Sequence, residues 1–218
     1  SAASDVYKRQ ELRTPLAVIQ TNLEVFARRE APALKDYQEI FAMLQEQTGR
    51  LSHLAEILLD MTGVQTVERS ERISLAALTD EVFCDLASIA EQKEVELIQQ
   101  EGDCIITGSY LLLYRAVYNL AENAIKYNKE NGKVNIWVGN TLNGKKVIVQ
   151  DTGIGIPKEH QDRIFERFYR VDKSHSRETG GTGLGLSIVK HGALLHNAEI
   201  HVESEEGKGT KMELIFHC

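Results

Sequence analysis

DTGIGIP, at residues 151–157, is the most informative stretch of this chain, and it directly follows a run, 146–150, that alternates as a strand does. At the end of a strand, the Asp151 carboxylate can accept a hydrogen bond from an exocyclic amine, and the glycines let the backbone approach a flat ring closely. The alternative is an ordinary Asp-Gly turn. The stretch therefore predicts either a site for a flat, amine-bearing ring or a simple turn.

A second glycine-rich stretch, GGTGLGLS at residues 180–187, runs into a helix predicted over about 184–195. Free backbone N–H groups at the start of a helix bind phosphate. The stretch lacks the Gly-Lys-Ser/Thr of a P-loop, and no strand directly precedes it, so neither a P-loop nor a dinucleotide-binding βαβ unit is predicted. A flexible loop that needs glycine only for its turns is the alternative.

The third stretch, NLAENAIKY at residues 119–127, lies in a helix predicted over 110–127, with Ser109 as its N-cap. Asn119, Asn123 and Lys126 have i, i+4, i+7 spacing and share one face, while the opposite stripe is apolar. Amide oxygens suit Mg²⁺ and an ammonium group suits phosphate, so this face predicts a metal–phosphate site. A solvated polar face is the alternative.

The sequence around these stretches alternates between helical and strand patterns. A further helix is predicted over 75–93, and Asn143-Gly144 is a hairpin turn signal between two strands. Residues 64–72 are polar and predict a linker. The strands are predicted at 95–99, 104–107, 134–138, 146–150, 199–203 and 211–216.

Residues 11–62 predict a helical hairpin. Apolar residues recur at steps of three and four along both halves, and Pro32 lies between the halves, where a helix must stop. Two helices alone bury too little apolar surface, so we expect two copies to pair into a four-helix bundle. A hairpin packed on the rest of the same chain is the alternative.

The composition is that of a globular protein, with 218 residues, a hydrophobic fraction of 42%, a charged fraction of 26% and a net charge of −7. No long basic cluster offsets this charge, so we expect no nucleic-acid partner. The sequence contains no apolar run of bilayer length and no secretory leader. The three cysteines are scattered and predict neither disulfides nor a zinc site, which fits a reducing cytosol.

The three stretches, in this order and with FERFYR at residues 165–170 between the glycine segments, resemble the sensor histidine kinases of two-component systems. Residues 119–127 are similar to the N box of that family, 151–156 and 181–187 to its two glycine boxes, and 165–170 to its phenylalanine box. ELRTPL at 11–16 is similar to the tail of its H box, and GKGT at 207–210 to a small glycine turn. The resemblance covers about residues 11–216. It implies an α+β protein, in which a helical hairpin precedes a Bergerat-type α/β sandwich that binds ATP and Mg²⁺.

The resemblance also assigns roles by position. Asp151 is expected to bind the adenine amine, and Asn123 to hold Mg²⁺ with Asn119 in support. Lys126 is expected to face the phosphates, Arg170 to lie near the γ-phosphate during transfer, and 174–181 to form a lid. The other positions expected to contact the nucleotide are Tyr127, Gly153, Ile154, Gly155, Ile156, Tyr169, Thr182, Gly183, Leu184, Gly185 and Leu186.

The same fold also serves hydrolytic ATPases, such as gyrase, Hsp90 and mismatch-repair proteins. These place a glutamate general base four residues before the metal-binding asparagine. Here that position holds Asn119, which activates water poorly. The resemblance therefore favours phosphoryl transfer to a protein nucleophile over steady hydrolysis.

One departure from the family concerns the phosphoacceptor, a histidine that directly precedes ELRTPL and is replaced here by Gln10. A carboxamide nitrogen is not a nucleophile because its lone pair is delocalised, so we expect autophosphorylation to be lost in the chain as written. Glu11 would be the acid/base neighbour of the missing histidine, and Glu11 with Thr14 forms a Glu-x-x-Thr pattern that supports dephosphorylation of the partner regulator in relatives. Either this is a degenerate kinase or residues 1–10 are a non-native leader, and we favour the leader.

The sequence thus predicts a leader at 1–10, a dimerisation and histidine-phosphotransfer hairpin at 11–63, a linker at 64–72 and a catalytic ATP-binding domain at 73–218. We expect the cytoplasmic core of a homodimeric kinase, which passes a phosphoryl group from ATP to histidine and then to an aspartate of a response-regulator receiver domain. Its full-length parent would carry a sensor and a membrane anchor upstream. The alternatives are an ATP-binding scaffold without kinase activity and a phosphatase of the regulator.

Overall fold

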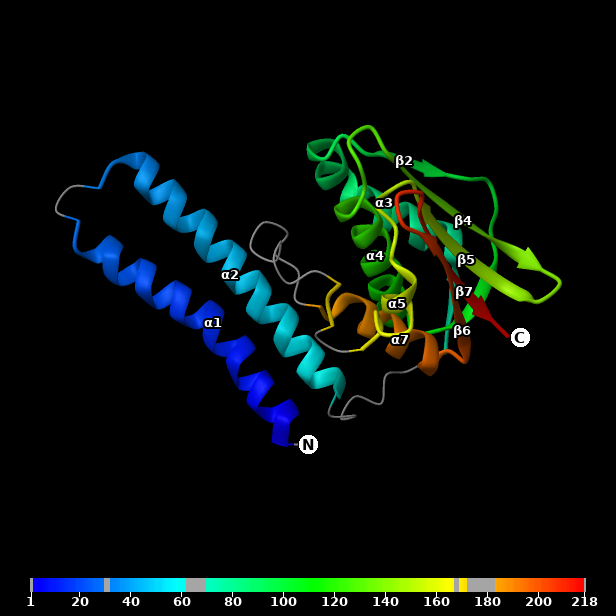
Figure 1. Cartoon of the computed structure of the whole chain (residues 1–218), viewed down its shortest axis with the longest axis horizontal. Coiled ribbons are helices and arrows are strands. Elements are labelled where there is room, and N and C mark those ends of the chain that lie inside the picture. The colour runs from blue at the N-terminus through cyan, green and yellow to red at the C-terminus, as the bar shows by residue number, and fades with distance from the viewer. Residues whose placement is uncertain (1, 30–31, 62–69, 167–168, 172–182, 218) are drawn as a thin grey trace. The chain divides into compact units, whose positions relative to one another are not determined.

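The computed structural model describes residues 2–29, 32–61, 70–166, 169–171 and 183–217. The chain divides into two compact units, Ser1–Thr66 and Val67–Cys218. The first is helical and the second is built from both helices and strands, as Figure 1 shows. Among the described residues, no helix combines the length and the apolar character that crossing a bilayer requires.

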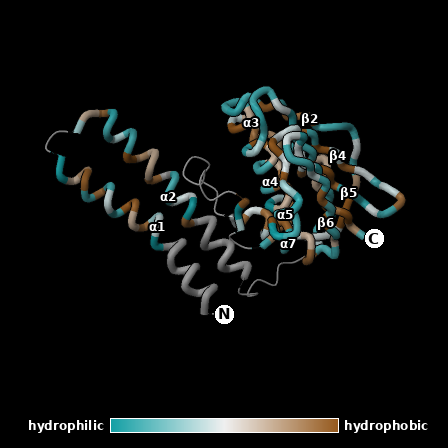
Figure 2. Tube along the Cα trace, in the orientation of Figure 1, coloured by the Kyte–Doolittle hydropathy of each residue, from teal (hydrophilic) through white to brown (hydrophobic). Residues whose placement is uncertain are grey.

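The first unit is the predicted helical hairpin, and the structure confirms it. Helix α1 spans Ala2–Ala27 and helix α2 spans Leu34–Met61. Phe26 and Tyr37 close the turn end, with ring centroids 5.0 Å apart in an edge-to-face arrangement. Asp36 accepts a hydrogen bond of 2.8 Å from the Ala33 N–H and so anchors the start of α2. Figure 2 shows hydrophobic positions recurring along the coloured part of each helix.

The second unit is built on a five-stranded sheet in the order β2-β4-β5-β7-β6. Strands β2 and β4 are parallel and all other neighbours are antiparallel. The β4–β5 hairpin turns at Leu142-Asn143, one residue before the predicted Asn143-Gly144, and Gly144, with a φ of 122°, begins β5. The strands are β2 (Glu96–Gln99), β4 (Lys133–Thr141), β5 (Gly144–Asp151), β6 (Ala198–Glu205) and β7 (Gly209–Phe216).

Three helices cover one face of this sheet (Figure 1): α3 (Leu75–Gln92), α4 (Tyr110–Lys126) and α7 (Gly185–Leu195). Alternate residues of β4, such as Val134 and Ile136, are fully buried in the core that the sheet and helices share. This layer arrangement confirms the expected α/β sandwich. A two-stranded sheet pairs β1 (Glu71–Ser74) with β3 (Ile105–Gly108).

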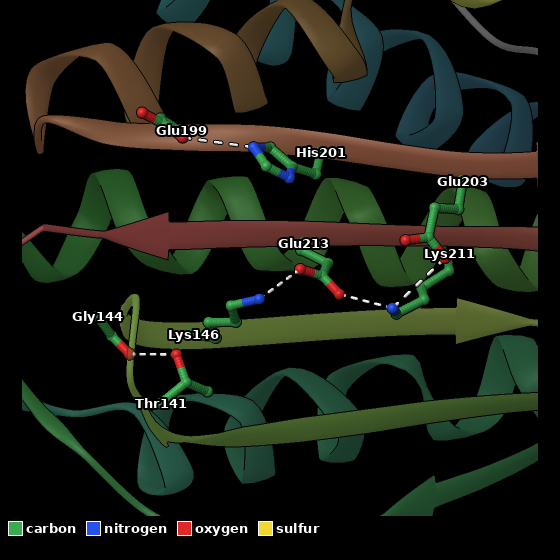
Figure 3. Close-up of polar contacts among 8 residues, drawn as sticks. All are labelled: Thr141, Gly144, Lys146, Glu199, His201, Glu203, Lys211 and Glu213. Atoms are coloured by element: carbon green, nitrogen blue, oxygen red, sulfur yellow. Dashed lines mark hydrogen bonds and ion pairs between the residues drawn. The ribbon is translucent and has the colours of Figure 1, made fainter.

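The other face of the sheet carries polar side chains (Figure 3). Glu213 accepts from Lys146 at 2.7 Å and from Lys211 at 2.6 Å, and Lys211 also lies 3.5 Å from Glu203. The hydrogen bonds from Lys146 and then Lys211 lower the pKa of Glu213, although burial opposes them. These charges on the polar face thus largely neutralise one another.

Three local features differ from the sequence predictions. Ser109 is the N-cap residue of α4, as predicted, but its side chain makes no capping hydrogen bond. The Ser109 N–H instead donates to Nε2 of His196, 2.9 Å away and 87 residues along the chain. Strand β1 begins at Glu71, inside the range predicted as linker. A short helix, α5 (Lys158–Gln161), follows the first glycine segment and was not predicted.

Candidate nucleotide-binding site

The asparagine face of α4 packs against the start of α7. Asn119 is only 6% exposed, and its side-chain nitrogen donates to the Arg115 carbonyl at 2.7 Å. A Cβ atom at Gly185 would lie 2.7 Å from Oδ1 of Asn119 and 3.6 Å from Nδ2 of Asn123. A larger residue at 185 would therefore displace the Asn119 amide, so glycine is what allows the two segments to approach.

The first glycine segment packs against the C-terminal end of the same helix. The Ile154 N–H donates to the Tyr127 carbonyl at 3.0 Å. A Cβ atom at Gly153 would lie 2.3 Å from that carbonyl oxygen, which no side chain can tolerate. The structure thus brings together all three motif segments around α4, as the site prediction requires.

Asp151 lies at the end of β5 and is held by two backbone donors. Its Oδ1 accepts from the Gly153 N–H at 2.8 Å and from the Thr210 N–H at 3.2 Å. Burial raises the pKa of the carboxyl group, and these two hydrogen bonds partly oppose the rise. All of its described hydrogen bonds reach Oδ1, so the predicted contact with a ligand amine would fall to Oδ2.

The end of α4 presents a cation and an aromatic ring side by side. The Lys126 ammonium lies 5.8 Å from the centroid of the Tyr127 ring, and Tyr127 is 41% exposed. Lys126 sits in the last turn of the helix, where the macrodipole favours a positive charge. Both side chains thus lie at the end of α4 against which the first glycine segment packs.

The apolar residues of the glycine segments differ in exposure. Leu184 is fully buried, and Ile156 and Leu186 pack on the core, so these three anchor their segments. Ile154 is 53% exposed. Gly155 and Gly183 have φ values of 70° and 69°, which favour glycine in each segment.

Tyr169 and Arg170, from the predicted phenylalanine box, are both half-buried. The Tyr169 hydroxyl lies 2.6 Å from Nδ1 of His160, and the Arg163 guanidinium stacks over the Tyr169 ring, 4.3 Å from its centroid. Sequence analysis did not single out His160 or Arg163 as part of this region. His160 lies in the single turn of α5 and Arg163 lies just after it, so no periodic pattern marks them.

Several predicted positions lie outside the described residues. These are Thr182, the predicted lid over 174–181 and the side chains of Gln10 and Glu11, whose backbone belongs to α1. Thr14 is exposed on α1. The site residues that sequence analysis missed include Thr210, whose N–H binds Asp151; it stands in the GKGT turn, which did signal a function.

Comparison with known proteins agrees with this geometry. A sequence model of the "Histidine kinase-, DNA gyrase B-, and HSP90-like ATPase" family matches residues 108–218, and a model of the "His Kinase A (phospho-acceptor) domain" matches residues 9–66. The chain belongs to the histidine kinases of two-component systems.

Among similar histidine kinases is the sensor histidine kinase RppB of Synechocystis, 36% identical over 92% of this chain and 45% of that protein. The phosphate regulon sensor protein PhoR of Pseudomonas aeruginosa is 33% identical over 94% of this chain and 47% of that protein. The chain thus spans about half the length of these relatives. The fold matches that of the Acinetobacter baumannii histidine kinase AdeS with a TM-score of 0.71, at 19% identity over 95% of this chain and 98% of that one.

Proposed function

We propose that the α/β unit binds Mg²⁺-ATP and donates the γ-phosphoryl group to a histidine on the helical hairpin, from which it passes to an aspartate of a response regulator. The observation that carries this proposal is Asp151, a half-buried carboxylate of raised pKa whose Oδ1 is fixed by two N–H donors. A buried charge of this kind destabilises the fold, so its presence favours a ligand-binding role. Oδ2 would accept the adenine amine.

The residues present also fit a magnesium ion. The Asn123 amide lies on the half-buried face of α4 beside Gly185, and an amide oxygen is a hard ligand of the kind Mg²⁺ takes. When bound, the ion would neutralise charge on the triphosphate. Lys126 would orient the phosphates as a point charge, and the α7 N-terminus, which begins at Gly185, would offer free N–H groups.

Asn119 argues for transfer rather than hydrolysis. Its amide is buried and donates to the helix backbone at Arg115, and a carboxamide is not a base at neutral pH. It can support the position of Asn123 one turn along the helix, but it cannot act as a general base for water. The site would therefore hold ATP until a protein nucleophile arrives in line with the γ-phosphorus.

The nucleophile is the point at which this chain departs from its relatives. In the transfer step, an imidazole nitrogen forms a bond to the γ-phosphorus as the bond to the β-phosphate oxygen breaks and ADP leaves. Gln10 occupies the acceptor position and has no such lone pair. We infer that the chain binds ATP without phosphorylating itself at residue 10, and that residues 1–10 are a non-native leader on a cytoplasmic kinase core. An ATP-binding scaffold, or a phosphatase that uses Glu11 and Thr14, is the second candidate, and the Gln10 substitution is the observation that favours it.

The hairpin supports a homodimer. Large apolar side chains remain solvent-exposed on it, including Leu16 at 51%, Leu23 at 42% and Phe41 at 63%. A second copy would cover them in a four-helix bundle. A response regulator is the expected partner of such a bundle; the histidine kinase ThkA, which shares the fold with a TM-score of 0.70 at 20% identity, was solved in complex with the response regulator protein TrrA.

Labelling with γ-³²P-ATP tests the proposal. The chain as it stands should bind ATP and remain unlabelled, whereas Gln10→His should acquire acid-labile label and pass it to a receiver domain. An Asn123→Ala change in the Gln10→His background is the matched control and should abolish labelling. If Gln10→His binds ATP but stays unlabelled, the kinase proposal is wrong; brisk release of phosphate without any partner would favour a hydrolytic ATPase.

A further inference from the structure

We propose that His160 is a positioning residue, which holds the Tyr169 side chain and thereby directs Arg170 toward the terminal phosphate of the nucleotide. This inference rests on the proposed function, since it assigns the residues that would distinguish ATP from ADP at the γ-phosphate. None of the sequence motifs contains His160. Its role follows from the contacts of α5 with the segments on either side of it.

Helix α5 is fixed to the nucleotide site by its last residue. The Gln161 side-chain nitrogen donates to the Ile156 carbonyl at 2.8 Å and to the Ser204 carbonyl at 3.0 Å. Ile156 ends the first glycine segment, and Ser204 lies near the end of β6. A helix of one turn has little stability of its own, so these two bonds determine where α5 sits.

His160, the residue before Gln161, contacts Tyr169 and so links the Tyr169 side chain to α5. The distance from its Nδ1 to the Tyr169 hydroxyl is 2.6 Å, and no other described side chain bonds that hydroxyl. Arg163 covers the ring face at 4.3 Å and pairs with Glu166 at 3.2 Å. The Tyr169 N–H also donates to the Glu166 carbonyl at 3.2 Å. The hydroxyl, ring and backbone of Tyr169 are thus each in contact with residues of the segment 160–166.

The hydrogen bonds that hold α5 also extend to Asp151, the carboxylate expected to bind adenine. The Ser204 hydroxyl accepts from the Ile156 N–H at 2.8 Å and lies 2.8 Å from the Thr210 hydroxyl. The Thr210 N–H in turn donates to Asp151. Hydrogen bonds therefore connect Asp151 to Tyr169 through Thr210, Ser204 and α5. This single network would position both the adenine and the terminal phosphate of a bound nucleotide.

Arg170 follows Tyr169 directly, so the way Tyr169 is held constrains the backbone from which the Arg170 side chain extends. A guanidinium group needs correct placement to bind a phosphate in a bidentate way, and a shift of about 1 Å can remove most of the benefit. ADP lacks the γ-phosphate. Loosening Tyr169 should therefore weaken ATP binding while leaving ADP binding unchanged.

Calorimetry of the intact chain with Mg²⁺-ATP and Mg²⁺-ADP tests this. We expect His160→Ala to weaken ATP binding between about 5- and 20-fold, with ADP affinity unchanged. His160→Asn, whose amide can replace Nδ1, should restore most of the difference. Tyr169→Phe keeps the ring against Arg163 and removes only the hydroxyl, so it should reproduce His160→Ala even if that variant folds poorly. His201→Ala removes an exposed histidine on the polar face of the sheet (Figure 3) and is the matched control.

A double-mutant cycle sharpens the test. If His160 acts through Arg170, then His160→Ala should add little to the loss of ATP preference caused by Arg170→Ala. Equal weakening of ATP and ADP by His160→Ala, or no change in either, would overturn the positioning role while the proposed function stands. Failure of the unaltered chain to bind either nucleotide would overturn the proposed function, and this inference with it.

Discussion

The two units of this chain bury their apolar residues very differently. In the α/β unit, Leu75, Leu86 and Leu214 are fully buried, whereas Leu16 and Leu23 of the hairpin remain about half exposed. A sheet with helices on one face closes a core within one chain, and two helices do not. The difference indicates that the α/β unit is folded in its own right, and it is what we expect if a second copy completes the hairpin as proposed.

The largest effect is expected when this second copy is excluded. Replacing both Leu16 and Leu23 by Glu places four like charges in the proposed bundle core. The dissociation constant of the dimer should therefore rise by more than about 100-fold. Light scattering coupled to size exclusion measures this directly. Leu142→Glu, at an exposed turn of the α/β unit, is the matched control and should leave the dimer intact. A double variant that stays dimeric would show that the hairpin seam is not the interface.

The next largest effect is a loss of stability of the α/β unit, which we expect from truncating a buried leucine but not an exposed one. Leu86→Ala removes a fully buried side chain of α3 and should lower the free energy of unfolding by about 2–5 kcal/mol. Leu194→Ala, on α7 and 74% exposed, should change it by less than about 0.5 kcal/mol. Urea denaturation of both variants gives the comparison, and equal losses would contradict the assigned core.

A smaller effect is expected at His196, which joins the start of α4 to the end of α7. Its Nε2 accepts from the Ser109 N–H, and its Nδ1 lies 2.8 Å from the Gly192 carbonyl. Because Ser109 is 1% exposed, His196→Ala should leave that N–H unsatisfied and lower the free energy of unfolding by about 1–3 kcal/mol. Chemical denaturation checks this, with the exposed His201→Ala as control. A loss no larger than the control would show that water replaces the imidazole.

The smallest effect concerns pH and the polar face of the sheet. The hydrogen bonds from Lys146 and Lys211 hold the Glu213 pKa below its ordinary value of 4.5. The resulting stabilisation is complete above that value and is lost as the pH falls through the lower pKa of the folded state. Glu213→Gln should therefore flatten the acid limb of the stability profile. Urea midpoints measured from about pH 6 down to about pH 3 would reveal it. An acid limb as steep as that of the unaltered chain would contradict this assignment.

The sequence alone was sufficient for the features with local signals. The helical hairpin and the helix that carries both asparagines follow from periodicity, and the structure confirms them. Turn chemistry placed the β4–β5 turn to within one residue. It was not sufficient where the determining partner is remote. The Ser109 N–H is satisfied by His196, 87 residues away, and α5 is positioned by contacts with β6. Such contacts exist only once the chain has folded.

At the candidate site, too, local sequence signals predicted some features and remote contacts determined the others. The motifs predicted which segments meet, and the packing of Gly153 on Tyr127 and of Gly185 on Asn119 is the steric reason why they do. The burial of Asn119 was not predicted, because helical spacing alone assigned it to a polar face that could equally have been solvated. The link from Asp151 through Ser204 to Tyr169 crosses three separate segments and leaves no periodic trace in the sequence.

Calorimetric titration of a non-hydrolysable ATP analogue tests the central claim most directly, with the Asp151→Asn variant beside the unaltered chain. We predict one Mg²⁺-dependent site per chain, and no measurable binding to Asp151→Asn. Because burial raises the Asp151 pKa, the ionised group destabilises the fold above that pKa, so the variant should also unfold at a higher temperature at neutral pH. Binding that survives Asp151→Asn, or that does not depend on Mg²⁺, would contradict the account.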